Sequence, residues 1–207
     1  MARLNVNPNR MELSRLKKRL VVAKRGHKLL KDKQDALIKA FLERAREGKA
    51  LREELESELA ACYKSFLLAR AQTLPAMLEQ ALMISGARCD LSVSLQNVMS
   101  VLVPVYQVEQ RGSPHNYGMA TSSASLDLAL ERFAGLVPKL IELAAKEKAI
   151  RLMAVEIEKT RRRVNALEHV LIPDFIETIR YISMKLDEQE RSTLSRLMKI
   201  KEIVRSH

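Results

Sequence analysis

The segment LSRLKKRLVVAKRGHKLLKDKQDALIKAF, residues 13–41, decides the fold that this sequence predicts. Counting alternately three and four residues onward from Leu13 gives a mostly apolar stripe that ends at Phe41. This spacing is typical of a coiled-coil helix, in which one narrow stripe packs against a partner helix. The stripe comprises Leu13, Leu16, Leu20, Ala23, His27, Leu30, Gln34, Leu37 and Phe41.

The helix that carries this stripe is predicted to begin beside Asn9. The Asn9 side chain can accept hydrogen bonds from free backbone N–H groups, and Glu12, three residues on, can reach back to the cap. The stripe resumes at Leu51 and continues to a predicted break at Pro75. We therefore expect residues 1–73 to form an N-terminal coiled-coil helix.

A second stripe with the same spacing runs through residues 126–207 and predicts a C-terminal coiled-coil helix. Two helices that each carry one stripe bury it most simply against each other, antiparallel. Facing residues should then have numbers that sum to about 208, within about a heptad, which places Leu37 near Leu171. The seam positions in this half include Val164, Leu167, Leu171, Ile182, Leu186 and Leu197.

Residues 74–125 differ in composition and contain three of the six glycines. Two short runs alternate with period two across a predicted turn at Gln96–Asn97, which indicates a β-hairpin with one apolar and one polar face. The apolar positions are Leu91, Val93, Leu95, Val101, Val103 and Val105. The predicted fold class is therefore all-α-dominated: a long two-helix antiparallel coiled coil with a small central β-hairpin module.

The composition limits the possible functions. The 207 residues carry a formal net charge of +11, which predicts an acidic partner without identifying it. Cys62 and Cys89 are far apart and have no close second pair, so neither a disulfide framework nor a zinc site is indicated. No apolar run approaches the ~18 residues that span a bilayer, and the N-terminus lacks the features of a signal peptide. We expect a soluble cytosolic protein.

The sequence contains no recognisable catalytic constellation. The segment around Gly48 and Lys49 does not match a phosphate-binding loop, and the four histidines stand apart without metal-ligand spacing. The crowded glutamates of residues 53–58 are typical of a solvated helix face. We therefore predict no cofactor, no metal and no enzymatic activity in this chain.

Three blocks of the sequence carry a family resemblance. They are NPNRMELSRLKKRL (7–20), RGHKLLKDKQDAL (25–37) and EKTRRRVNALEHVLIPDFIETIRYI (158–182). Together they resemble the D subunit of the V-type and archaeal-type rotary ATPases, and the similarity covers nearly the whole chain. The family more often has threonine at the position of Asn9, but asparagine caps a helix at least as well.

The resemblance implies a central stalk, or rotor shaft, formed with the small F subunit. This stalk turns inside a hexamer of catalytic A and non-catalytic B subunits, where ATP is hydrolysed. Its lower end is expected to sit on a funnel-shaped subunit above the membrane ring. Rotation would couple ATP hydrolysis or synthesis to transport of H⁺ or Na⁺, and the chain would be cytoplasmic and peripheral to the membrane.

Arg161, Arg162 and Arg163 are the residues that we expect to contact the surrounding ring. Because the seam passes through Val164, these arginines should point outward, where guanidinium groups can meet carboxylates. The alternative is an ordinary solvated basic face. Pro173 removes one backbone hydrogen bond and should bend the helix.

Two other classes of function remain open at this stage. A nucleic-acid-binding coiled coil would explain the positive charge, although no aromatic platform or groove-reading motif is present. A structural scaffold or membrane-surface protein is the other alternative, although the helices lack the broad apolar face with Trp or Phe that is expected of interfacial binding. Neither predicts insertion into the membrane.

Overall fold

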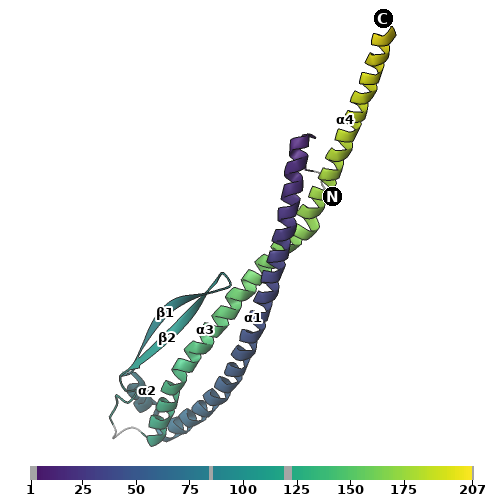
Figure 1. The fold of residues 1–207 in the computed structure, drawn as a ribbon. Helices are drawn as coiled ribbons and strands as arrows, with labels where there is room; N and C mark the ends of the chain where they lie inside the picture. Colours follow the sequence, from purple (N-terminus) through teal and green to yellow (C-terminus); the bar gives the residue numbers. More distant parts are fainter. Residues whose placement is uncertain (1–3, 84–85, 119–122, 207) are drawn as a thin grey trace. The chain divides into compact units, whose positions relative to one another are not determined.

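The computed structural model describes residues 4–83, 86–118 and 123–206 (Figure 1). The long helices are α1 (Arg10–Gln72), α3 (Ala124–Ala166) and α4 (Ile172–Ser206), with a π-helix, Leu167–Leu171, between the last two. The other described elements are the short helix α2 (Pro75–Met83) and the strands β1 (Arg88–Val98) and β2 (Val101–Arg111). The predicted fold class is confirmed.

The chain divides into two compact units. The terminal unit comprises Met1–Ala36 and Ile157–His207, and the hairpin unit comprises Leu37–Glu156. Each unit pairs a segment of α1 with a segment from the C-terminal half of the chain. Contacts in the terminal unit join His27 to Glu168, whereas contacts in the hairpin unit join Glu58 to Lys139.

The paired helices run antiparallel, but their register differs from the prediction. Ser125, at the start of α3, donates a hydrogen bond to Gln72, at the end of α1, over 2.7 Å. The pairing is thereby displaced by roughly three helical turns from the predicted one. The expectation that Leu37 lies near Leu171 was wrong because it assumed that the chain reverses its direction at the midpoint of the sequence. The long helices are joined earlier, between Gln72 and Ala124.

The start of α1 follows the predicted capping chemistry in part. Asn9 Oδ1 accepts a hydrogen bond from the Glu12 backbone N–H over 2.6 Å, and the Asn9 carbonyl accepts one from Leu13 over 3.0 Å. The Glu12 carboxylate does not return to the cap, because it pairs with Arg15 Nη1 at 3.3 Å. Asn9 thus provides hydrogen-bond acceptors for two backbone N–H groups of the first turn, with its own side chain and carbonyl.

The stripe that begins at Leu13 forms the inward face of α1. Leu16 and Leu37 are buried, and the other stripe positions through Phe41 are all partly buried. In the C-terminal half, Val164 and Ile182 are buried, while Leu167 and Leu186 are partly buried. A heptad stripe therefore locates the packed face of each helix, even though it does not fix the register.

Two buried threonines interrupt the apolar seam of the terminal unit. Thr160 and Thr178 are each 1% exposed. Thr178 Oγ1 donates to the Asp174 carbonyl over 2.7 Å and accepts a hydrogen bond from the Leu4 backbone N–H over 3.2 Å. Because the hydroxyl is satisfied, its burial is tolerated, and it ties the segment before α1 onto α4.

Short apolar clusters join the helices of the hairpin unit. One contains Leu55, Cys62 and Leu136, and Cys62 Sγ lies 3.6 Å from the Ala129 carbonyl oxygen. The other contains Ala69, Leu78 and Leu126. Leu78 belongs to α2, which the sequence analysis did not predict. This helix is only nine residues long, and it is stabilised by packing one leucine against the end of the coil.

The hairpin forms as predicted, but its turn lies elsewhere. Strands β1 and β2 pair antiparallel from Arg88 with Arg111 to Val98 with Val101, so the turn is Met99–Ser100 and not Gln96–Asn97. Met99 and Ser100 have φ angles of 52° and 71°. Positive φ at both central residues is typical of a type I′ turn, whose twist suits a two-residue hairpin.

The position of this turn decides which side chains share a face. Directly opposed residues point to the same side of a sheet, and Ser94 lies opposite Val105 while Val93 lies opposite Tyr106. The apolar residues of β1 and β2 therefore lie on opposite faces, so the prediction of one apolar and one polar face was wrong. The packed face carries Val101, Val103 and Val105. The opposite face carries the exposed side chains of Leu91, Val93, Leu95 and Leu102, and it also carries Pro104, which is buried, and Gln110 near the base of the hairpin.

The π-helix lies immediately before Pro173. The Ile172 N–H donates to the Leu167 carbonyl, one residue further back than in an α-helix. Pro173 has no N–H to offer His169, and the wider turn absorbs this loss without ending the helix. The structural effect of Pro173, which we predicted as a bend, thus includes a local change of helix type.

Gly112 permits the chain to leave β2. It has φ +87°, and a Cβ added there would lie 2.1 Å from the Gly86 carbonyl oxygen. We expect Gly112→Ala to weaken the base of the hairpin by more than about 1 kcal/mol, measured as faster amide exchange across residues 88–111. Gly135→Ala is the matched control, because its Cβ would meet nothing within 4 Å. Equal exchange in both variants would contradict a conformational role for Gly112.

Candidate interaction surfaces

The positive charge of the protein is concentrated in the terminal unit. Residues 4–36 and 157–206 contain 21 Lys or Arg against 11 Asp or Glu. The hairpin unit, residues 37–156, contains 14 of each and is therefore formally neutral. The net positive charge of the terminal unit attracts an acidic partner, whereas the hairpin unit has no net charge to attract one.

The three consecutive arginines lie on this basic unit. Arg161, Arg162 and Arg163 are all exposed, although Thr160 and Val164 on either side of them are buried. Arg162 pairs with Glu158, one helical turn earlier. Since this pair is solvent-exposed, it is worth at most about 1 kcal/mol, so an external carboxylate can displace it.

The last part of α4 extends beyond the start of α1 (Figure 1). Glu190 pairs with Arg10, the first residue of α1, and residues 191–205 are exposed throughout. Several large apolar side chains in this C-terminal extension are more than half exposed. They are Leu194, Leu197, Met198, Ile200, Ile203 and Val204.

These six side chains occupy one broad side of the extension. At 100° per residue they fall within about 220° of the helix circumference, which is wide enough to pack against protein. Leu197, which we predicted to lie on the seam, is 56% exposed because α1 begins too late in the sequence to cover it. Leu171, the last residue of the π-helix, is also exposed, at 40%.

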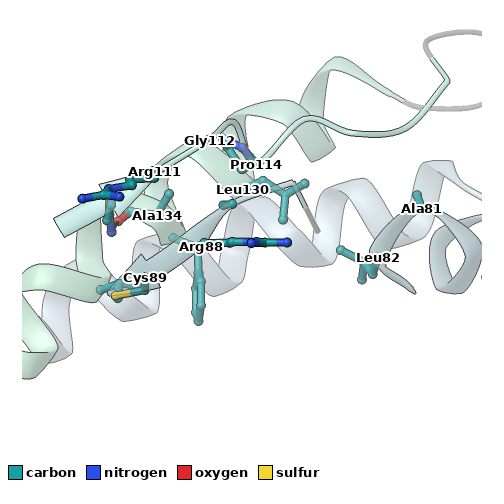
Figure 2. A pocket seen from close by; sticks show the side chains of 13 residues that line it. Ala81, Leu82, Arg88, Cys89, Arg111, Gly112, Pro114, Leu130 and Ala134 are labelled. Carbon is teal, nitrogen blue, oxygen red and sulfur yellow. Dashed lines mark hydrogen bonds between the residues drawn. The ribbon is translucent and has the colours of Figure 1, made fainter. Parts of the chain in front are cut away.

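A cavity lies at the base of the hairpin, between the strands, α2 and α3 (Figure 2). Its volume is about 280 Å³, and its walls are largely apolar, with Leu82, Leu130 and Val137 among the lining residues. Arg88 and Arg111, which are directly paired in the sheet, also line it. Arg111 is engaged by Asp90 at 3.7 Å and by Glu109 at 2.8 Å.

Hydrogen bonds tie the segment after the hairpin to α3. Tyr117 donates its hydroxyl proton to Asp127 Oδ1 over 2.6 Å, and His115 Nδ1 lies 3.3 Å from the same hydroxyl. Burial and the hydrogen bond to Asp127 raise the pKa of Tyr117 above its ordinary value. The phenol therefore stays protonated, and remains a donor, at neutral pH.

Lys139 joins the two helices of the hairpin unit. Its Nζ lies 2.5 Å from Glu58 Oε1 and 3.5 Å from Glu54 Oε1. The hydrogen bond to Glu58 is the main cause that raises the pKa of Lys139, and Glu54 adds to it. These glutamates belong to the acidic cluster of residues 53–58, which therefore contributes structural ion pairs between the helices.

Comparison with known proteins identifies the family. The model of the ATP synthase D subunit family matches residues 12–202. The V-type ATP synthase D subunit of Thermoanaerobacter sp. (strain X514) is 55% identical over 206 residues, which cover 99% of each chain. That of Clostridium botulinum (strain Langeland) is 53% identical over 207 residues, covering 98% of this chain and 96% of its own.

The chain belongs to the ATP synthase D subunit family. The resemblance drawn from the three sequence blocks is therefore confirmed. Within this member of the family, none of the helices in the described ranges is both long and apolar enough to cross a bilayer. Over the same ranges, no group of three or more His, Cys, Asp or Glu is placed to hold a metal ion.

The structure separates the residues singled out in the sequence. The arginines at 161–163 and the seam residue Ile182 lie in the terminal unit, whereas the hairpin and its apolar positions lie in the hairpin unit. Sequence reasoning missed the concentration of charge, because it considered only the net charge of the whole chain. Counting charge over successive segments of the chain would have found it.

Proposed function

We propose that this member of the D subunit family is the central stalk, or rotor shaft, of a V/A-type rotary ATPase. In this role it couples ATP hydrolysis or synthesis in the ring of A and B subunits to transport of H⁺ or Na⁺ across the membrane. The observation that carries the proposal is the similarity to V-type ATP synthase D subunit sequences over almost the full length of both chains.

The physical properties of the two units suit a shaft. Paired antiparallel helices resist bending and twisting better than one helix does, and each unit contains such a pair with buried side chains between the helices. The terminal unit adds a net positive charge and the apolar C-terminal extension. A shaft that turns inside an acidic ring uses contacts of this kind, since exposed ion pairs are weak enough to break at each step.

The proposed partners follow from this role. The ring of A and B subunits surrounds the basic terminal unit, and Arg161, Arg162 and Arg163 contact its carboxylates in turn. The small F subunit binds the stalk, and a funnel-shaped subunit links it to the membrane ring. The chain itself is non-catalytic, binds no cofactor, and is cytoplasmic and peripheral to the membrane as part of the complex.

Purification of the tagged full chain from its own cells tests the proposal. We expect the A, B and F subunits to co-purify in fixed ratio, and the isolated chain to hydrolyse no ATP. Mass spectrometry and a phosphate-release assay measure the two outcomes. Recovery of the chain without A and B, together with salt-sensitive binding to unrelated DNA, would instead support the nucleic-acid-binding alternative.

A further inference from the structure

Helix α3 contains a proline in its interior. Pro138 lies well inside Ala124–Ala166 and has no backbone N–H. In a regular α-helix that N–H would donate to the carbonyl four residues earlier, which here belongs to Ala134. The Ala134 carbonyl is therefore left without its helical donor and can accept a hydrogen bond from another group.

The hairpin supplies that partner. Gln110, near the end of β2, donates a hydrogen bond from Nε2 to the Ala134 carbonyl oxygen over 2.8 Å. Because a carbonyl only accepts, the amide must present its NH₂ group and not its oxygen. Gln110 and Ala134 both line the cavity at the base of the hairpin, and Figure 2 shows Ala134 there.

We propose that Pro138 and Gln110 form a positioning pair that sets where the hairpin lies along α3. Elsewhere in a helix interior each carbonyl is already bonded to the next turn, so a strand side chain finds no preferred carbonyl there. The proline exposes one carbonyl, and the glutamine binds it. Given the proposed function, this pair makes the hairpin turn with the shaft as one body.

A double-mutant cycle on the full chain tests the inference. The variants are Gln110→Met, Pro138→Ala and the two combined, and the measurement is amide exchange across residues 88–111. In the parent background Gln110→Met should speed this exchange by about fivefold, the effect of losing one typical hydrogen bond. With Pro138→Ala, residue 138 regains an N–H that satisfies Ala134, so Gln110→Met should then change exchange by less than about twofold.

Two controls separate this effect from general loosening. Gln107→Met alters an exposed glutamine on the same strand and should leave exchange unchanged. Gln110→Glu keeps the shape but places a carboxylate against the carbonyl, so it should speed exchange more than Gln110→Met does. Equal effects of Gln110→Met in both backgrounds, or no effect in either, would overturn the inference. The proposed function is untouched by that result, because exchange on the isolated chain involves no partner.

Discussion

For the stalk role proposed above, replacing Leu197 and Ile200 by aspartate is expected to weaken binding of the chain to the A/B ring by about 100-fold or more. Both side chains are more than half exposed on the apolar face of the C-terminal extension. Burial of each against a partner is worth roughly 1.5–3 kcal/mol, which exceeds what an exposed ion pair contributes. Titration of the ring with the full chain measures the loss.

The matched control changes the same charge on the other face of the extension. Ser192 and Ser195 fall outside the apolar arc. The double variant Ser192→Asp, Ser195→Asp should bind the ring with an affinity within a few-fold of the parent, because charges at the rim of an interface change affinity only a little. Thermal unfolding of the isolated chain should be unchanged in both variants, because none of these side chains is packed. Equal loss of binding in the two variants would show that charge, and not apolar contact, is responsible.

Reversing the charge of Arg161, Arg162 and Arg163 to glutamate is the second large expected effect. The substitution removes more than half of the formal net charge of +11. Association with the ring should slow by at least about tenfold at low ionic strength, and the difference from the parent should shrink as salt is added. Stopped-flow association at several salt concentrations measures both quantities.

The control for this prediction uses the neutral unit. Arg46, Arg70 and Lys148 are exposed in the hairpin unit, and their replacement by glutamate changes the net charge by the same amount. We expect a much smaller change in association rate there, because the attracting charge lies elsewhere. If both triple variants slow association equally, only the total charge matters, and the arginines are an ordinary solvated face.

Much of the architecture could be predicted because the packed face of a helix requires apolar residues at regular intervals in the sequence. Leu16, Leu37 and Ile182 stand at heptad positions, and the structure buries all three. The cap at Asn9 and the existence of the hairpin were also predictable, since capping and strand alternation are local properties. The family resemblance added the function that periodicity alone could not supply.

The parts that could not be predicted depend on distances between elements. The register is set by where the helices join, and a heptad stripe on each helix does not specify that point. The faces of the hairpin depended on locating the turn at Met99–Ser100, because moving a turn by one residue exchanges the two sides of a strand. The bond from Gln110 to Ala134 joins residues whose relation becomes visible only after folding.

The π-helix has a consequence for how sequences of this family can change. The apolar stripe needs 22 residues to run from Val164 to Leu186, which is one residue more than three heptads. The π-helix at Leu167–Leu171 accommodates one extra residue in its wider turn. Deleting one residue there would yield a regular α-helix but would rotate everything after it by about 100° relative to what precedes it. Insertions and deletions in this stretch are therefore constrained by the helical rotation that they cause. The arginines and the C-terminal apolar face keep their relative orientation around the helix only if the extra residue is retained.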